Sequence, residues 1–529
     1  MSRVTGVLFV ILCLLPGAAM GQARASSYVA MDSWVYPVLD RMIARGEMQS
    51  DGSAMRPWTR MQIASLLIHC RSCEGAESEE LRREFAEELG GTNSVRVGSV
   101  YARSEQIAGR PLTNAFDYGQ TVVHDFGRPN REGQNFVAGM EAWADSRWLM
   151  SGVRVEYQQS GAASDTAERV IVERIDGQIA ANRWDTRAIH RVRMLEGYAG
   201  TRVGNFQVSV GRQGLHWGPG YSGAMLMGEN AEPLTMLRIR NAESFRLPWI
   251  FAHLGDWRGE MFVGKLEGHA QPYSPWLQGQ KITLQLTPNL EFGFSRTIVF
   301  AGGGRGLATS FGRSFLSVGN NMSTTPGTAA DVGDRRGGFD FQYRLPMLRN
   351  HVTLYADSFT DDDPSPLAAP HRSAFLSGLY FPTLPGLNKM DLRVESAYTD
   401  APGVRGDGRF FYVNGGYTQS YTNDGQLLGH WAGRAGKAYQ GWATYWFSTT
   451  TKAQFNVKTL QVSPKYLPGG GRQWDFTGRY ETRIRRTTEF AVNIQVEKWR
   501  LPMLESGVRT NVSLSFQTTY HPHWRAPAN

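Results

Sequence analysis

The dominant pattern in the chain is a regular alternation of apolar and polar residues, repeated over short stretches from residue 95 onward. Gly, Pro, Asn and Asp separate one stretch from the next. The clearest stretches are residues 282–287, 339–344, 490–497 and 511–517. A period of two places successive side chains on opposite faces of an extended strand. The pattern therefore predicts a body made of many short antiparallel β-strands.

Two further features favour a barrel in a membrane over a soluble sandwich or propeller. Large charged residues lie on the polar faces of strands, as with Arg479, Glu481 and Arg483. Aromatic residues gather near strand ends, at Tyr343, Tyr398, Trp446, Phe447, Trp474, Tyr480, Trp499 and Tyr520. A wet interior and aromatic girdles at both interfaces are typical of outer-membrane barrels. At roughly 20–25 residues per strand and turn, residues 95–520 would make about 18 strands.

The first 25 residues have the features of a secretory signal peptide. Arg3 precedes an apolar run from Val4 to Leu15, and Ala23-Arg24-Ala25 offers a small-residue cleavage site. The apolar run is shorter than the roughly 20 residues that a membrane-spanning helix needs. We therefore expect the mature protein to be exported.

Between residues 26 and 92 the apolar period changes from 2 to 3.6, which predicts helices. A first helix begins near Val35 and ends at Gly46, because glycine is the common residue after a helix C-terminus. A second begins after Thr59, the first residue of the capping-box pattern Thr59-Arg-Met-Gln62. A third runs from Ser78 to Gly90. Helices this short are marginal alone, so they are expected to pack on one another or on the barrel.

Cys70 and Cys73 are the cysteines that remain once the signal peptide is removed. In an oxidising compartment this pair most simply forms a disulfide that closes a small loop. A zinc site would need a second pair of ligands, and a thioredoxin-like site would need a strand–helix context. We expect neither a metal nor a cofactor.

The formal charge of +8 and the pI near 9.3 suggest an anionic partner. An exported protein does not meet nucleic acid in its normal setting. An anionic surface polymer or anionic lipid headgroups fit the charge better, although a basic surface without a specialised partner remains open.

The most distinctive stretch runs from Asn205 to Gly268. It begins as a strand and breaks at Gly218-Pro219-Gly220, which a helix or a central strand does not tolerate. A long loop then mixes aromatic residues, acids and arginines, and loops of this length are commonly functional. We expect this loop to fold into the lumen, with Met225, Leu226 and Met227 packing it in place.

The run from Val210-Gly-Arg-Gln through Trp217-Gly-Pro-Gly-Tyr-Ser-Gly223 to Leu237-Arg238 resembles the core motif of the Wzi-type capsule assembly proteins. The resemblance covers about 60 residues and implies an outer-membrane barrel that binds capsular polysaccharide. It also implies that the N-terminal helices plug the periplasmic end. The layout Asp32-Ser-Trp34, Leu39, Gly46 and Pro57-Trp-Thr-Arg60 resembles, in addition, an S-layer-homology module that binds cell-wall polymers.

Sugar binding needs flat aromatic residues for stacking and planar hydrogen-bonding groups, and acidic sugars add arginines. The central stretch supplies this mixture, at Arg212, Trp217, Tyr221, Glu229, Asn230, Arg238, Arg240, Arg246 and Trp249. Each of these residues could instead belong to a hydrogen-bonded network that holds the loop.

Two other functions are open. Glu229, Glu232, Asp256 and Glu260 could act as glycosidase carboxylates, or His216 and Ser222 as base and nucleophile, but no G-x-S-x-G elbow is present. A general porin is the other alternative. We favour a non-enzymatic protein that is monomeric in the membrane and binds an acidic extracellular polysaccharide.

The predicted organisation is an all-β transmembrane barrel of about 18 antiparallel strands with a small helical plug. Its expected parts are a signal peptide (1–25), a helical periplasmic plug (26–92), an outer-membrane barrel (93–520) and a C-terminal tail (521–529). Long turns are expected at residues 302–306, 320–336, 360–370 and 401–408, and longer loops are extracellular in such barrels.

Overall fold

In a computed structural model of the chain, the structure describes residues 24–70, 72–163, 187–303, 307–316, 333–348, 351–361, 366–367, 369–401, 403 and 406–522. The predicted signal peptide, apart from residues 24 and 25, lies outside these ranges. The predicted tail beyond residue 522 and parts of all four long turns lie outside them too.

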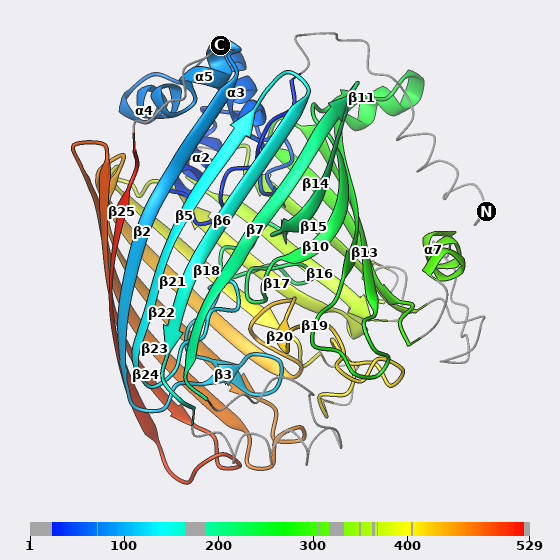
Figure 1. The fold of residues 1–529 in the computed structure, drawn as a ribbon, viewed down its shortest axis with the longest axis vertical. Helices are drawn as coiled ribbons and strands as arrows, with labels where there is room; N and C mark the ends of the chain where they lie inside the picture. The colour runs from blue at the N-terminus through cyan, green and yellow to red at the C-terminus, as the bar shows by residue number, and fades with distance from the viewer. Residues whose placement is uncertain are drawn as a thin grey trace.

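Eighteen strands of the described chain close into one antiparallel barrel (Figure 1). Around the wall they are β2 (Ser94–Ala108), β5 (Gly133–Asp145), β6 (Leu149–Ser160), β7 (Ile189–Val203), β8 (Phe206–Gln213), β10 (Leu234–Asn241), β12 (Asp256–Lys265), β13 (Trp276–Thr287), β14 (Leu290–Phe300), β15 (Asp334–Arg344), β16 (Thr353–Asp361), β17 (Ala374–Phe381), β18 (Met390–Tyr398), β21 (Gly436–Ser448), β22 (Thr451–Val462), β23 (Gly471–Ile484), β24 (Thr488–Arg500) and β25 (Arg509–Tyr520). β25 pairs with β2 and completes the circle. The predicted fold class is confirmed.

Seven shorter strands accompany the wall. β11 (Phe245–Arg246) pairs with β12. The others form separate two-stranded pairs, namely β1 (Met55–Arg56) with β9 (His216–Trp217), β3 (Thr113–Asn114) with β4 (Gly119–Gln120), and β19 (Thr422–Asn423) with β20 (Gln426–Leu427).

The wall has polar residues inside and apolar residues outside, the reverse of a soluble barrel. In β25, Asn511 and Ser513 are buried in the interior while Val512 and Leu514 are exposed. The same alternation recurs on neighbouring strands, where Ile494, Phe476 and Phe455 are exposed. An apolar exterior of this kind suits contact with lipid.

The expected aromatic girdle is only partly present. Trp474, Tyr480 and Tyr520 are exposed on the outer face. Trp446 and Trp499 are instead buried, which corrects the prediction for these two residues. Their indole N–H groups donate to Asp391 Oδ2 at 2.5 Å and to the carbonyl of Arg110 at 3.0 Å. An interior acceptor thus fixes each ring within the barrel.

Four helices of residues 35–90 gather at one end of the barrel (Figure 1). They are α2 (Val35–Arg45), α3 (Arg60–His69), α4 (Ala76–Glu84) and α5 (Ala86–Gly90). The Thr59 side chain accepts a hydrogen bond from the Gln62 N–H at 3.1 Å, as the capping pattern predicts. Gly46 ends α2 in a left-handed conformation, φ 77°. The expected third helix is divided between α4 and α5, because Phe85 leaves helical geometry while its ring is buried beneath the Arg60 guanidinium.

The N-terminal segment, residues 24–59, is attached to the inner face of the wall. The Ser27 N–H donates to Asp145 Oδ1 at 2.7 Å, and the two oxygens of Asp32 accept from Arg154 at 2.9 and 2.7 Å. On the opposite wall, Arg344 donates to the carbonyl of Ile43 at 3.0 Å. Ion pairs and hydrogen bonds to several strands therefore hold the helices in the mouth of the barrel.

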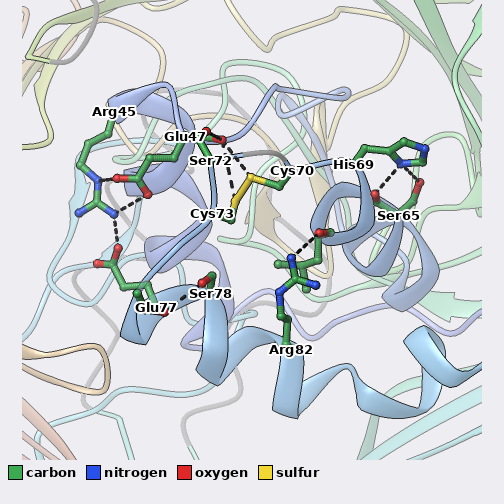
Figure 2. Close-up of a disulfide and its surroundings, with 12 residues drawn as sticks. Arg45, Glu47, Ser65, His69, Cys70, Ser72, Cys73, Glu77, Ser78 and Arg82 are labelled. Carbon is green, nitrogen blue, oxygen red and sulfur yellow. Dashed lines mark hydrogen bonds and ion pairs between the residues drawn. A yellow bond between two sulfur atoms is a disulfide. The ribbon is translucent and has the colours of Figure 1, made fainter.

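A disulfide joins Cys70 and Cys73 just after α3 (Figure 2). Ser72, inside the small loop, donates a hydrogen bond to the carbonyl of Glu47 at 2.8 Å. Glu77 at the start of α4 pairs with Arg41 at 2.9 Å and also with Arg45. The loop thereby connects the end of α2 to the turn between α3 and α4.

The two ends of the barrel differ in the length of their connections. At the helical end the strands are joined by short turns such as residues 146–148, 204–205 and 449–450. At the other end the connections are long, including residues 109–132, 214–233 and 399–435. The described connections between strands also contain one α-helix and two short 3-10 helices, which are α7 (Leu307–Leu316), η1 (Trp249–Leu254) and η2 (Pro370–Arg372). Among the described residues, no helix has the length and apolar character required to span a bilayer.

Candidate functional site

The central loop, residues 214–233, folds into the lumen. Met225, Leu226 and Met227 belong to a buried cluster that includes Phe359 and Tyr412. The Met225 N–H donates to Asp357 Oδ2 at 2.7 Å, and the Tyr412 hydroxyl donates to the Met225 carbonyl at 2.6 Å. The expectation that these three residues pack the loop is therefore confirmed.

The central loop meets the N-terminal segment in the lumen. β9 of the loop pairs with β1 of the segment, with Trp217 opposite Met55 and His216 opposite Arg56. The Gly218 N–H donates to the Ala54 carbonyl at 3.0 Å. The interior is thus filled by two parts of the chain that bind each other.

Two glycines of the motif are required by close approaches. A Cβ on Gly211 (φ 134°) would lie 2.1 Å from the carbonyl oxygen of Gly197 on β7. A Cβ on Gly218 (φ 153°) would lie 2.5 Å from Asp357 Oδ2. Both positions therefore need glycine for space as well as for backbone geometry.

Most of the candidate binding residues are enclosed. Trp217, Asn230, Arg238 and Arg240 are buried, and Glu229 lies 3.3 Å from His216 in the interior. Arg240 donates to the carbonyl of Pro57 at 2.7 Å. Such contacts hold the central loop and the N-terminal segment, so a bound sugar does not reach these side chains in this arrangement.

Tyr221 and Arg212 lie on different sides of the lumen, Tyr221 against β18 and β21 and Arg212 on β8. The Tyr221 ring packs against Trp442 and beneath the Arg393 guanidinium, 4.5 Å from its centroid. Arg212 pairs with Glu232 at 2.8 Å. Of the nine candidates, Arg212 is thus connected to the polar cavity described below.

Arg246 and Trp249 lie at the helical end of the barrel, away from the other candidates. Arg246 pairs with Asp256 at 2.9 Å on the surface, and Trp249 is 87% exposed. Sequence proximity had grouped them with the motif, but the intervening strand β10 crosses the wall.

The Ser222 and His430 side chains are adjacent, but their hydrogen bonding opposes a hydrolase. His430 Nε2 lies 3.0 Å from Ser222 Oγ, while its Nδ1 accepts from the Ala432 N–H at 3.1 Å. Because Nδ1 is an acceptor, the neutral ring carries its proton on Nε2 and donates it to Ser222. That tautomer cannot remove a proton from the hydroxyl. His216, the base considered from the sequence, faces Glu229 instead.

A polar cavity of about 770 Å³ lies at the long-loop end. Its lining comes from the β2–β5 connection, the facing ends of β6 and β7, and the β19–β20 hairpin. Figure 1 places β3 and β20 at this end, opposite the helices. Charged side chains in the lining are Arg110, Arg128, Arg131, Arg187, Arg191, Glu132, Glu232 and Asp424. The described lining contains no Trp, Tyr or Phe, so it favours hydrogen bonds and charge over ring stacking.

Three arginines converge on Glu232 at the cavity. Its carboxylate accepts from Arg191 at 3.2 Å, from Arg212 at 2.8 Å, and from Arg193. The Glu232 side chain is 3% exposed, whereas that of Arg191 is 34% exposed. Arg191 is therefore the guanidinium of this group that an incoming anion contacts first.

Asp125 fixes the loop that forms another wall of the cavity. Its two oxygens accept from Arg103 at 2.7 and 2.6 Å, and Arg128 adds a contact at 2.9 Å. Arg128 also donates to Glu156 at 2.9 Å. The network thus joins loop 109–132 to β2 and β6.

The loops inside the barrel are expected to be weakened by acid. Burial alone would raise the pKa of Asp125, but Arg103 and Arg128 hold it well below its usual 3.8. Burial lowers the pKa of His430 well below 6.5, as do His124 and His216. The stability from Asp125 is complete above its ordinary pKa and is lost as the pH falls toward its folded value. His430 acts at higher pH. Below about pH 6.5 the imidazole binds a proton in the unfolded state but not in the folded state, so the free energy of unfolding falls as the pH falls.

Unfolding midpoints of the detergent-solubilised barrel should therefore begin to fall below about pH 6.5 and fall more steeply below about pH 4, measured from about pH 7 to pH 2. In the His430→Gln variant, which removes one of these groups, the fall in the midpoint between about pH 6.5 and pH 4 should be smaller. A midpoint that is constant across this range would contradict the expectation.

Sequence reasoning missed the cavity and the residues that hold it, Asp125, Arg128, Arg191 and Glu232. Only Glu232 had been considered, and in a catalytic role. These residues come from separate connections, and nothing in their local sequence marks them as neighbours. Among the described residues, no group of three or more His, Cys, Asp or Glu side chains is arranged to hold a metal ion.

Comparison with known proteins identifies relatives of the chain. The family model described as "Capsule assembly protein Wzi" matches residues 102–514. A Klebsiella pneumoniae protein, described as an uncharacterized 55.8 kDa protein in the cps region, is 27% identical over 185 residues. The match covers 34% of this chain and spans about a third of that relative, 35% of its length.

A solved structure has a similar fold. It is described as Wzi, an outer membrane protein involved in group 1 capsule assembly in Escherichia coli and a carbohydrate-binding β-barrel. The two superpose with a TM-score of 0.67 at 15% identity, over 94% of this chain and 99% of the other. At this identity the likeness establishes the fold. The S-layer-homology resemblance of the N-terminal helices is not supported.

Proposed function

Because the chain belongs to the capsule assembly protein Wzi family, we propose that it is a non-enzymatic outer-membrane protein that binds acidic capsular polysaccharide and helps to attach it at the cell surface. The observation that carries the proposal is the arginine-rich cavity at the long-loop end. It acts as a monomer within the membrane, without a cofactor.

The orientation follows from the lengths of the connections. Short turns are periplasmic and long loops extracellular in outer-membrane barrels. The cavity therefore faces the cell exterior, where capsule lies. Residues 26–92 form a plug at the periplasmic end, and residues 1–25 are the signal peptide removed on export.

The chemistry of the cavity suits a uronic acid or another carboxylated sugar. Guanidinium groups pair with carboxylates through parallel charge-assisted hydrogen bonds. Thr113 and Gln426, both half-buried in the lining, add neutral groups for hydroxyls. Charge rather than stacking on an aromatic ring thus selects the ligand.

A filled lumen weighs against the porin alternative. The central loop and the N-terminal segment pair through β9 and β1, and they cover Arg238 and Glu260 of the wall, which are fully buried. An open porin has a polar, water-filled channel in this position.

Substituting Arg191 by glutamine is expected to weaken binding of a uronic-acid-containing capsular oligosaccharide. Loss of one charge-assisted hydrogen bond costs about 1.5–3 kcal/mol, or roughly tenfold to hundredfold in Kd. Calorimetric titration of the purified barrel measures the change. Arg212 and Arg193 still hold Glu232 in the variant, so the cavity should keep its shape.

The matched control is Arg246→Gln, an equivalent charge loss at the periplasmic end, which should leave the Kd unchanged. Equal affinity in the Arg191→Gln variant and the parent would refute the assignment of the cavity. Parent protein that binds no capsular oligosaccharide at all would refute the proposed function.

A further inference from the structure

The longest connection at the helical end of the barrel joins β10 to β12 through residues 242–255. β11 keeps the segment attached to the wall, with Phe245 opposite Trp257 and Arg246 opposite Asp256. η1 follows and lies against β13. Figure 1 shows β11 at the rim, at the same end as α3 to α5.

η1 presents several large apolar side chains to its surroundings. Trp249 is 87% exposed, Ile250 72%, Phe251 46% and Leu254 37%, and no residue of η1 is buried. Trp249 has φ 61°, a left-handed conformation that is uncommon for a bulky residue. A contiguous apolar patch of this kind marks an interaction surface.

The wall beside η1 faces lipid. Arg240, Arg258 and Glu260 are buried in the lumen, so the residues next to them in their strands point outward. An outer notch of about 40 Å³ is lined by Phe206, Ile239, Phe245, Trp257, Met261 and Ile282. Farther along the same strands, Val210 and Leu237 are exposed. η1 therefore continues an apolar surface that already contacts acyl chains.

The chemistry along this rim matches a membrane interface. Trp148, on another turn of the same end, is exposed, and the Arg147 guanidinium lies 5.0 Å from its ring centroid. Arg246 is also exposed beside the apolar side chains of η1. Tryptophan is enriched at the level of lipid headgroups, and arginine pairs with their phosphates.

We propose that η1 anchors the barrel in the phospholipid leaflet at its helical end, with Trp249, Ile250 and Phe251 inserted at the boundary between headgroups and acyl chains. Acyl chains of the same phospholipids contact the apolar side chains that line the adjacent notch. That this leaflet is the periplasmic one rests on the orientation proposed above. The contact of η1 with phospholipid does not depend on whether the barrel binds a glycan.

Spin labels on single cysteines test the anchor in the full barrel, reconstituted into phosphatidylethanolamine and phosphatidylglycerol vesicles. Cys70 and Cys73 are bonded to each other, so within the described part of the chain the introduced thiol is the free one. The test site is Ile250→Cys. Leu237→Cys on the outer wall is the lipid reference, and Glu79→Cys on α4, 64% exposed, is the water reference.

For each spin label, the rate of collision with oxygen is divided by the rate of collision with a water-soluble nickel chelate. This ratio rises with the depth of the label in the bilayer. At position 250 we expect a ratio several-fold higher than at position 79 but below that at position 237, which lies farther along the wall from the rim. A ratio equal to that at position 79 would place η1 in water, as a docking surface for a periplasmic protein, and would overturn the proposal. Both references sit on elements outside η1, so they also report whether the barrel has inserted.

Discussion

Replacing Glu260 by alanine is expected to lower the free energy of unfolding by about 3–5 kcal/mol. The Glu260 and Arg238 side chains are both completely enclosed, with Oε2 2.5 Å from Nη2. The other carboxylate oxygen accepts from Trp217 Nε1 at 2.9 Å. The variant leaves a guanidinium without its counterion and an indole N–H without its acceptor. Removing one partner of a buried ion pair is costly because the remaining charge stays away from water.

Urea unfolding of the solubilised barrel, followed by tryptophan fluorescence, measures this loss. Glu260→Gln retains an acceptor for Trp217 and should be less harmful. The double variant Arg238→Met, Glu260→Met removes both charges together and should recover much of the stability, since apolar replacements of buried pairs are often tolerated. A Glu260→Ala protein as stable as its parent would show that the pair is dispensable.

Replacing Asp125 by alanine is expected to have a comparable effect on stability, about 3–5 kcal/mol, and also to abolish oligosaccharide binding. The change removes the shared counterion of Arg103 and Arg128. Arg128 lines the cavity, and loop 109–132 depends on the same carboxylate for its attachment to β2. Stability and binding should therefore fall together, measured by urea unfolding and calorimetry on the same preparation.

The exposed pair at the opposite end is the matched control for Asp125. Asp256 lies 2.9 Å from Arg246, and both side chains are about half exposed. Asp256→Ala should cost less than about 1 kcal/mol, because solvent screens exposed ion pairs. If Asp125→Ala were as mild as Asp256→Ala, the loop would not depend on its buried network.

The wall of the barrel could be predicted from sequence because each strand carries its own pattern. The alternation at residues 511–517 marks β25 without knowledge of its partners, and the repeated pattern gives an approximate count of strands. The caps at Thr59 and Gly46 are local in the same way, since each depends on a few neighbouring residues. The break at Phe85 is not local, because it depends on burial of the ring beneath Arg60.

The site could be predicted only in part because exposure is not a local property. Arginine and tryptophan are needed equally by a sugar-binding surface and by a buried network. Arg238 and Trp249 were assigned the same role from sequence, but one is enclosed in the lumen and the other lies on the outer rim. The cavity brings together residues from connections as distant as 110–132 and 424–426, whose proximity follows from closure of the barrel.

The wall closes along a single seam, where β25 pairs with β2 from Val512 opposite Ala108 to Tyr520 opposite Val100. Without β25, both β2 and β24 would present unpaired N–H and C=O groups along an open edge. Hydrocarbon offers no hydrogen-bonding partner for such groups, so a sheet with open edges does not persist in a bilayer. Insertion of the earlier strands thus remains incomplete until β25 has paired with β2.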